Sequence, residues 1–331
     1  MRQRRVKSNG PGYYHIISRI IEEMFKLIED EPFLFITILR KVAIFSGVRI
    51  LDYVIMSNHF HLIVFASGRC LANEEELLRR YYVLYGKEEA RKLKNRWRKL
   101  KETRHLNELE REKDNLRRRM EDISEFMKTL KQRFSMSYNS RHKRKGPLWD
   151  DRFKSILVHP KALPILSAYL ALNPVRAKIK SDPKDYLYSG YGAAIAGKKW
   201  ARRGLIEVYA ASGEGASWRE IAERHRMLIY GRGGRHGIHP PVYNRDEVER
   251  VIAEGGKLTL FQLLRCRVRY FINGFAIGIR EFVEECFRNH PWCFGAKRKT
   301  GSRIIRGYGG ELGELFLARD LRREVLRPMK A

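Results

Sequence analysis

The apolar run over residues 53–65 constrains this chain most, because His59 and His61 interrupt it with a single residue between them. Side chains of a strand alternate between its two faces, so both imidazoles are predicted to project from one face while Phe60 enters the core on the other. Two imidazoles at this spacing can chelate one divalent cation, which can polarise a phosphate. Two half-exposed histidines on an edge strand are the alternative interpretation.

The elements around this pair predict an α+β fold. The residue pattern favours a strand over 13–20, a helix over 31–45, and strands over 49–56 and 59–65 that are joined by a tight turn at Ser57-Asn58. The order strand, helix, strand, strand opens a ferredoxin-like unit with an antiparallel sheet.

The charge of the chain indicates its partner. Its 331 residues hold 67 Lys plus Arg against 38 Asp plus Glu, a formal net charge of +29, and 11% of them are aromatic. Such an excess of cations suits a polyanion, and aromatic rings can stack on bases, so nucleic acid is the expected partner, against the alternative of a merely basic soluble protein. Without an apolar stretch of ~18 residues, we expect no membrane association and a cytoplasmic, nucleoid-associated location. The four cysteines form no C-x-x-C pair, which argues against a zinc ribbon.

Residues 73–141 are predicted to be almost wholly helical and basic. Residues 91–120 hold 13 Lys or Arg and 5 Asp or Glu. This segment reads either as a basic arm that lies along a nucleic-acid backbone or as a solvated helix pair with salt-bridged faces.

A second candidate cluster follows it. A basic loop over 141–149 ends in an aromatic residue, a short strand is expected over 153–158, and a helix over 161–172 stops before Pro174. Tyr169 and Asn173 are four residues apart and so share one helical face. A tyrosine hydroxyl can attack a phosphodiester, and an amide oxygen can complete a metal site begun by two imidazoles. A packed tyrosine and a helix-end cap are the alternatives.

Four segments resemble the single-tyrosine HUH transposases, and among them the REP-associated tyrosine transposases of bacteria. They match in the family's order within residues 13–191, and they read MSNHFHLIV (56–64), FMKTLKQRF (126–134), GPLWDDRFKS (146–155) and YLALNPVRA (169–177). The resemblance implies an RRM-like fold, a Mg²⁺ or Mn²⁺ site, and the cutting and rejoining of single-stranded DNA beside imperfect palindromic hairpins.

The resemblance also implies roles for single residues. His59, His61 and Asn173 correspond to the metal ligands and Tyr169 to the nucleophile, while position 171, often acidic in such sequences, is Ala171. Tyr138, at the end of the basic helix, is a weaker candidate for the nucleophile. The basic motifs nominate these residues for DNA contact: Arg141, Lys143, Arg144, Lys145, Trp149, Arg152, Lys154 and Arg176.

The sequence divides at about residue 198. We expect residues 1–197 to form the HUH endonuclease domain, and 198–331 a helical accessory region with a glycine-rich basic linker at 231–237 and paired helices around Gly274 and Gly278. That region is either a helix-turn-helix DNA-binding domain or a buttress for the catalytic domain.

The expected activity is therefore that of a metal-dependent single-stranded DNA endonuclease and strand transferase. The alternative is a non-catalytic protein that binds repeat DNA with the same fold. Whether one chain or a homodimer assembles each site is left open by the sequence.

Overall fold

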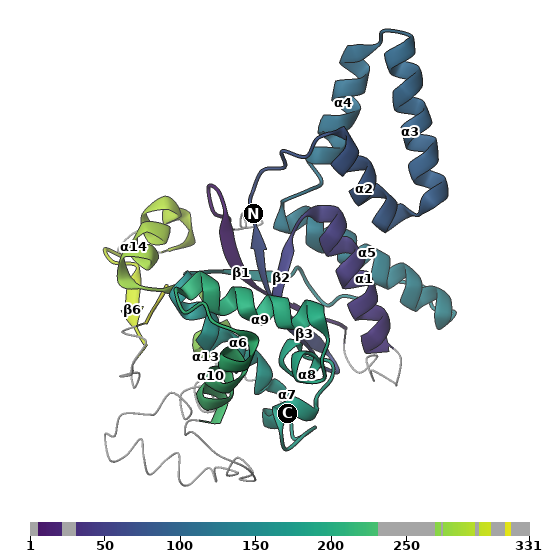
Figure 1. Ribbon diagram of the computed structural model, residues 1–331. Coiled ribbons are helices and arrows are strands. Elements are labelled where there is room, and N and C mark those ends of the chain that lie inside the picture. The colour runs from purple at the N-terminus through teal and green to yellow at the C-terminus, as the bar shows by residue number, and fades with distance from the viewer. Residues whose placement is uncertain are drawn as a thin grey trace, which may run out of the picture.

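The computed structural model describes residues 6–21, 31–230, 269–272, 274–294, 298–305 and 315–318. In this part of the chain a seven-stranded sheet carries helices on both faces (Figure 1), so the predicted α+β class is confirmed. No helix within the same ranges is both long enough and apolar enough to cross a membrane.

The first half of the sheet contains the expected hairpin. Its strands follow the order β2-β3-β1-β4, and each neighbouring pair is antiparallel. The elements that build it are β1 (Gly12–Arg19), α1 (Glu31–Ser46), β2 (Arg49–Ile55), β3 (His59–Ala66) and β4 (Lys154–Val158). The predicted sequence of strand, helix, strand, strand is confirmed, and the boundaries differ by one residue or less at each end.

Alternation along β3 gives the sheet two different faces. Phe60 is buried and its ring lies 4.8 Å from that of Phe35 on α1, which in turn contacts Phe134 on α5 (Ile123–Arg141). His59 and His61 point to the opposite face. That face is covered by α6 (Leu163–Ala171), which is followed directly by α7 (Asn173–Arg176).

The basic segment between β3 and β4 forms four helices. Figure 1 shows three of them protruding from the sheet as an arm: α2 (Glu74–Tyr85), α3 (Lys87–Glu102) and α4 (Leu106–Arg117). Trp97 is buried between α3 and α4, and its indole N–H donates a hydrogen bond to Glu112. The arm therefore buries apolar surface between its helices, and the prediction of an almost wholly helical segment is confirmed.

The chain after β4 covers the histidine face and one edge of the sheet. After α6 and α7 come α8 (Gly190–Ile195), α9 (Lys199–Ser212) and α10 (Trp218–Tyr230), and short 3₁₀ turns lie at Pro160–Ala162 and Pro183–Asp185. α9 packs closely on β2: a Cβ atom at Gly204 would lie 2.3 Å from the main-chain oxygen of Leu51. Only glycine permits that approach.

The C-terminal region is not purely helical, and on this point the prediction is wrong. The helices α9 and α10 belong to this region, and its described parts beyond them are α13 (Arg269–Ile272), β5 (Ala276–Gly278), α14 (Arg280–Asn289), the 3₁₀ turn Pro291–Cys293, β6 (Ser302–Ile304) and β7 (Phe316–Ala318). β5 pairs in parallel with β4, and β7 and β6 extend the sheet beyond it. The turn expected at 274–278, between the paired helices, contains the strand β5, because the buried residues Ala276 and Ile277 pair with the edge of β4. The linker at 231–237 and most of the first of the paired helices, expected over 260–270, lie outside the described residues.

Candidate functional site

Both histidines of β3 lie at the covered face of the sheet. His61 faces Ile17 and His59 faces Arg19 across the β1–β3 ladder. The imidazoles are 8% (His59) and 3% (His61) exposed, and their ring centroids are 5.1 Å apart at a steep angle. The structure thus brings the two side chains together on one face, and they are buried rather than half-exposed.

One ring nitrogen of each histidine is already engaged. The Nδ1 atom of His59 lies 2.7 Å from the amide oxygen of Asn58, and the Nδ1 atom of His61 lies 2.9 Å from Nε2 of His15. Since an amide oxygen only accepts, His59 donates from Nδ1 and keeps the lone pair on Nε2. Burial, with Arg19 and Arg176 nearby, lowers the pKa of His59 to about 4, and burial also lowers the pKa of His61. Both rings are therefore neutral at pH 7, which is the form that binds metals.

Tyr169 lies on α6 beside these rings. Its ring centroid is 5.8 Å from that of His61 and 6.2 Å from that of His15, both in edge-to-face geometry. The ring stacks on Phe271 of α13 at 4.7 Å, and the Arg176 guanidinium lies 4.4 Å from its centroid. The side chain is 1% exposed, so burial raises the pKa of Tyr169 while Arg176 opposes the shift.

Asn173 closes the end of α6. Its side-chain nitrogen donates to the main-chain oxygens of Tyr169, at 3.1 Å, and Leu170, at 3.3 Å. The side-chain nitrogen of Asn173 thus caps the end of α6, as the alternative interpretation of this residue expects. The amide oxygen is the atom that Asn173 can offer to a cation.

The donor set fits a divalent cation in part. Two neutral imidazoles and one amide oxygen are suitable ligands, and Mn²⁺ accepts imidazole more readily than Mg²⁺ does. Within the described ranges no group of three or more His, Cys, Asp or Glu side chains could hold a metal ion. A cation here would therefore also need oxygen atoms from water or from a substrate.

The predicted DNA-contacting loop lies at the His59 end of the sheet. The amide of Ile21 donates to the oxygen of Leu148, and the amide of Asp150 donates to the oxygen of Arg19, so the loop is fixed to the end of β1. The exposed cations of this loop and of the end of α5 are Arg141, Lys143, Lys145 and Arg152, while Arg144 is half-buried and donates to the oxygen of Pro147. Arg141 also lies 3.4 Å from Glu31.

The remaining three predicted contacts are placed differently from one another. Trp149 is half-buried, its indole N–H donates to Ser135 at 2.7 Å, and its ring lies 5.8 Å from Phe60, so it packs against the core. Lys154 pairs with Ile17 on β1 and so belongs to the histidine face. Arg176 lies over Tyr169, as described above.

The helical arm has features of both interpretations, a solvated helix pair with salt-bridged faces and a basic arm that binds nucleic acid. Many of its cations are paired with acids, including Arg96 with Glu112, Lys101 with Glu74 at 2.7 Å, and Arg117 with Asp114 at 2.9 Å. Salt-bridged faces are thus present. Helix α3 nevertheless has eight Lys or Arg and three Glu, which leaves a surplus of positive charge.

Sequence reasoning missed His15, Arg19 and Phe271. His15 is a polar residue in the middle of an apolar strand, which is a signal, but it is equally typical of a satisfied core histidine. Arg19 could have been found from the hairpin register, since it faces His59. Phe271 is 256 residues from His15, and no local pattern connects the two.

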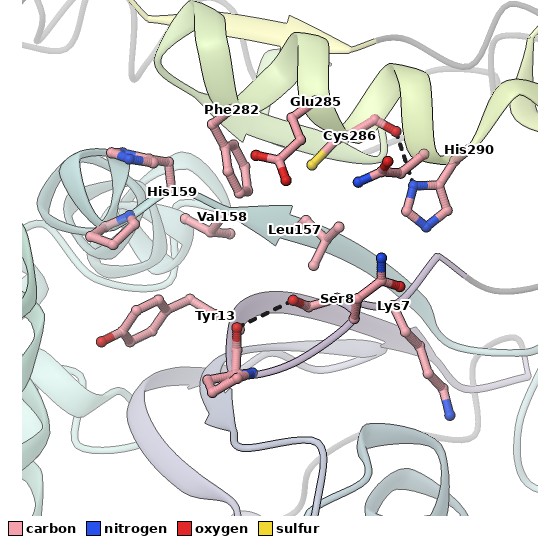
Figure 2. Close-up of a pocket in the computed structure, with 15 residues that line it drawn as sticks. Lys7, Ser8, Tyr13, Leu157, Val158, His159, Phe282, Glu285, Cys286 and His290 are labelled. Carbon is pink, nitrogen blue, oxygen red and sulfur yellow. Dashed lines mark hydrogen bonds between the residues drawn. The ribbon is translucent and has the colours of Figure 1, made fainter.

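A separate cavity of about 260 Å³ lies at the other end of β1. Figure 2 shows it between β1, β4 and α14, with His159 beside Phe282 and the His290 ring hydrogen bonded to the Cys286 main-chain oxygen. Its lining includes neither the two histidines of β3 nor Tyr169. This cavity is thus separate from the residues of the candidate chemistry.

Comparisons with known proteins find a distant likeness to a solved structure. No family model and no curated protein matches the chain. A solved structure described as a REP-associated tyrosine transposase bound to a REP hairpin is similar, with a TM-score of 0.39 and 14% identity. The similarity covers 60% of this chain and 87% of that one. At these values the comparison assigns no role to any residue of this chain.

Proposed function

We propose that this protein is a metal-dependent single-stranded DNA endonuclease and strand transferase of the tyrosine HUH type, which acts at palindromic hairpins. Its strand order β2-β3-β1-β4 with intervening helices supports the ferredoxin-like arrangement that such an enzyme would need. Mg²⁺ or Mn²⁺ would be its cofactor. Hairpin DNA on the nucleoid would be its partner, bound by one chain or by a homodimer.

One observation supports this proposal most. Tyr169 lies beside His61 on the same face of the sheet, and both histidines of β3 have Nδ1 engaged in a hydrogen bond, which leaves Nε2 as the nitrogen that could bind a cation. The candidate nucleophile and the two candidate histidine ligands thus belong to one buried cluster, although Tyr169 follows His61 by 108 positions in the sequence.

The chain's own residues would share the work of cleavage. Tyr169 would attack the phosphorus: the bond from its oxygen forms as the bond to the 3′ oxygen breaks, and the proton that the tyrosine loses is balanced by the one that the 3′ oxygen gains. When bound, the cation would draw charge from the phosphate oxygens. Arg19 and Arg176 supply positive potential beside His59. The resulting 5′-phosphotyrosine could be attacked by a 3′-hydroxyl, which rejoins DNA.

A second function is favoured by the burial of Tyr169. Its ring is 1% exposed beneath Phe271, so a phosphate can reach the hydroxyl only after side chains move. A protein that binds hairpin DNA through its basic surfaces and never opens this site would be a non-catalytic regulator.

Cleavage of labelled hairpin oligonucleotides with Mn²⁺ separates the two functions. The transferase predicts a nicked strand whose formation stops with EDTA and with His59→Ala, while His105→Ala, a change at an exposed arm histidine, leaves it unchanged. If the protein binds the hairpin oligonucleotides but nicks none of them, the result favours the non-catalytic regulator.

A further inference from the structure

His15 lies in the centre of β1 with both ring nitrogens engaged. Its Nδ1 atom is 3.0 Å from the main-chain oxygen of Phe271, and its Nε2 atom is 2.9 Å from Nδ1 of His61. The ring is 0% exposed and lies nearly parallel to that of His61. Three residues from distant parts of the sequence thus form one continuous chain of hydrogen bonds.

The Phe271 carbonyl at one end of this series of hydrogen bonds fixes which atom donates in each of them. A carbonyl oxygen can only accept, so Nδ1 of His15 must carry the proton. A neutral His15 then has its lone pair on Nε2, and it accepts from Nδ1–H of His61. His61 therefore has its own lone pair on Nε2, the nitrogen that does not face His15. The full burial of the His15 ring favours its neutral form.

We propose that His15 is a positioning residue, which holds His61 in the Nδ1–H form and in the orientation that presents Nε2 to a metal ion. The inference rests on the proposed function for the identity of the ligand, but the tautomer itself does not depend on any metal. Asn58 gives His59 the same form through a different partner. Each of the two candidate metal-binding nitrogens is thus prepared by its own hydrogen bond.

The chain of hydrogen bonds also connects the C-terminal region to the site. Phe271 accepts from His15 through its main chain and stacks on Tyr169 through its ring. Since α13 immediately precedes the strand that pairs with β4, the sheet extension holds this acceptor in place. The described C-terminal part is then a component of the site rather than a separate attachment.

Two substitutions at His15 distinguish positioning from packing. His15→Gln retains an acceptor for His61 and a donor for Phe271, whereas His15→Leu fills similar space without either. We expect His15→Leu to weaken Mn²⁺ binding about 10- to 100-fold, and His15→Gln to restore most of it. His225→Leu is the matched control, because His225 is also 0% exposed but bonds to Tyr209. It should leave Mn²⁺ affinity unchanged.

A readout without metal tests the tautomer directly. In ¹⁵N-histidine NMR of the full chain, His61 should carry its proton on Nδ1 in the wild type and in His15→Gln, and should lose that preference in His15→Leu. A wild-type His61 protonated on Nε2, or an unchanged tautomer in His15→Leu, overturns the inference. If His15→Leu does not fold, the wild-type and His15→Gln spectra still decide it. A confirmed tautomer in a protein that neither binds Mn²⁺ nor cuts DNA would instead refute the proposed function.

Discussion

The Ser167 hydroxyl on α6 donates a 2.5 Å hydrogen bond to the carboxylate of Asp52 on β2. Ser167 is two residues before Tyr169, so this bond fixes the helix that carries the candidate nucleophile to the sheet that carries the histidines. Asp52 is 2% exposed, and its other oxygen accepts from the amide of Tyr53. Burial raises the pKa of Asp52 to about 7, despite both hydrogen bonds.

Asp52 should make the protein less stable as pH rises. The ordinary pKa of an aspartate is 3.8 and that of Asp52 in the fold is about 7, so between these values the folded carboxyl holds more protons than the unfolded one. Its stabilisation is complete below pH 3.8 and is lost as pH rises through 7, at up to about 1.4 kcal/mol per pH unit. Asp52→Asn removes this titration. Urea unfolding between about pH 4.5 and 8 should show the variant gaining stability relative to wild type as pH increases. Parallel stability curves would contradict this role of Asp52.

Gly204→Ala should destabilise the fold, although it lies within a helix. At an exposed helical position the change would stabilise by about 1 kcal/mol. Here the new Cβ atom would lie 2.3 Å from the main-chain oxygen of Leu51, so α9 must move away from β2, at a cost of about 1–3 kcal/mol. Gly215→Ala, whose nearest neighbour would be 3.8 Å away, is the control and should be neutral within about 1 kcal/mol. Thermal unfolding of both variants checks this, and a stabilised Gly204→Ala protein would disprove the close packing.

The two kinds of candidate metal ligand should differ in importance. His59→Ala or His61→Ala removes a nitrogen donor and should reduce Mn²⁺ affinity, measured by calorimetry, by more than about 10-fold. Asn173→Ala should cost less, because a water molecule can replace a neutral oxygen ligand. His105→Ala should bind like wild type. An Asn173→Ala protein that loses as much affinity as His59→Ala would mean that the assignment of ligands is wrong.

The part of the site that local patterns encode could be predicted from the sequence. Alternation over residues 59–65 places both histidines on one face, and the two-residue turn before them fixes the hairpin. The helix with Tyr169 and Asn173 follows from its apolar run and from Pro174. These patterns do not predict how deeply each side chain of the site is buried. Nothing in the local sequence indicates that the Tyr169 ring stacks on Phe271, because that contact depends on where α13 packs in the folded protein.

The C-terminal strands escaped prediction for a related reason. β5, β6 and β7 have three residues each, too few to show a period of two. β5 forms on the open edge of β4, β7 pairs with β5, and β6 pairs with β7, so all three strands depend on tertiary pairing. The same pairing positions the Phe271 carbonyl near His15, so the role of His15 was equally hidden from the sequence.

Covalent capture of DNA tests whether Tyr169 is the nucleophile. Tyr169→Phe removes one oxygen and keeps the ring that contacts Phe271 and Arg176, so fold and DNA binding should be retained. Tyr138→Phe is the matched control, a tyrosine 7% exposed on α5. Each protein is incubated with labelled hairpin DNA and Mn²⁺ and then denatured. The proposed mechanism predicts a denaturant-resistant protein–DNA adduct with wild type and Tyr138→Phe and none with Tyr169→Phe. An adduct that persists in Tyr169→Phe would contradict it.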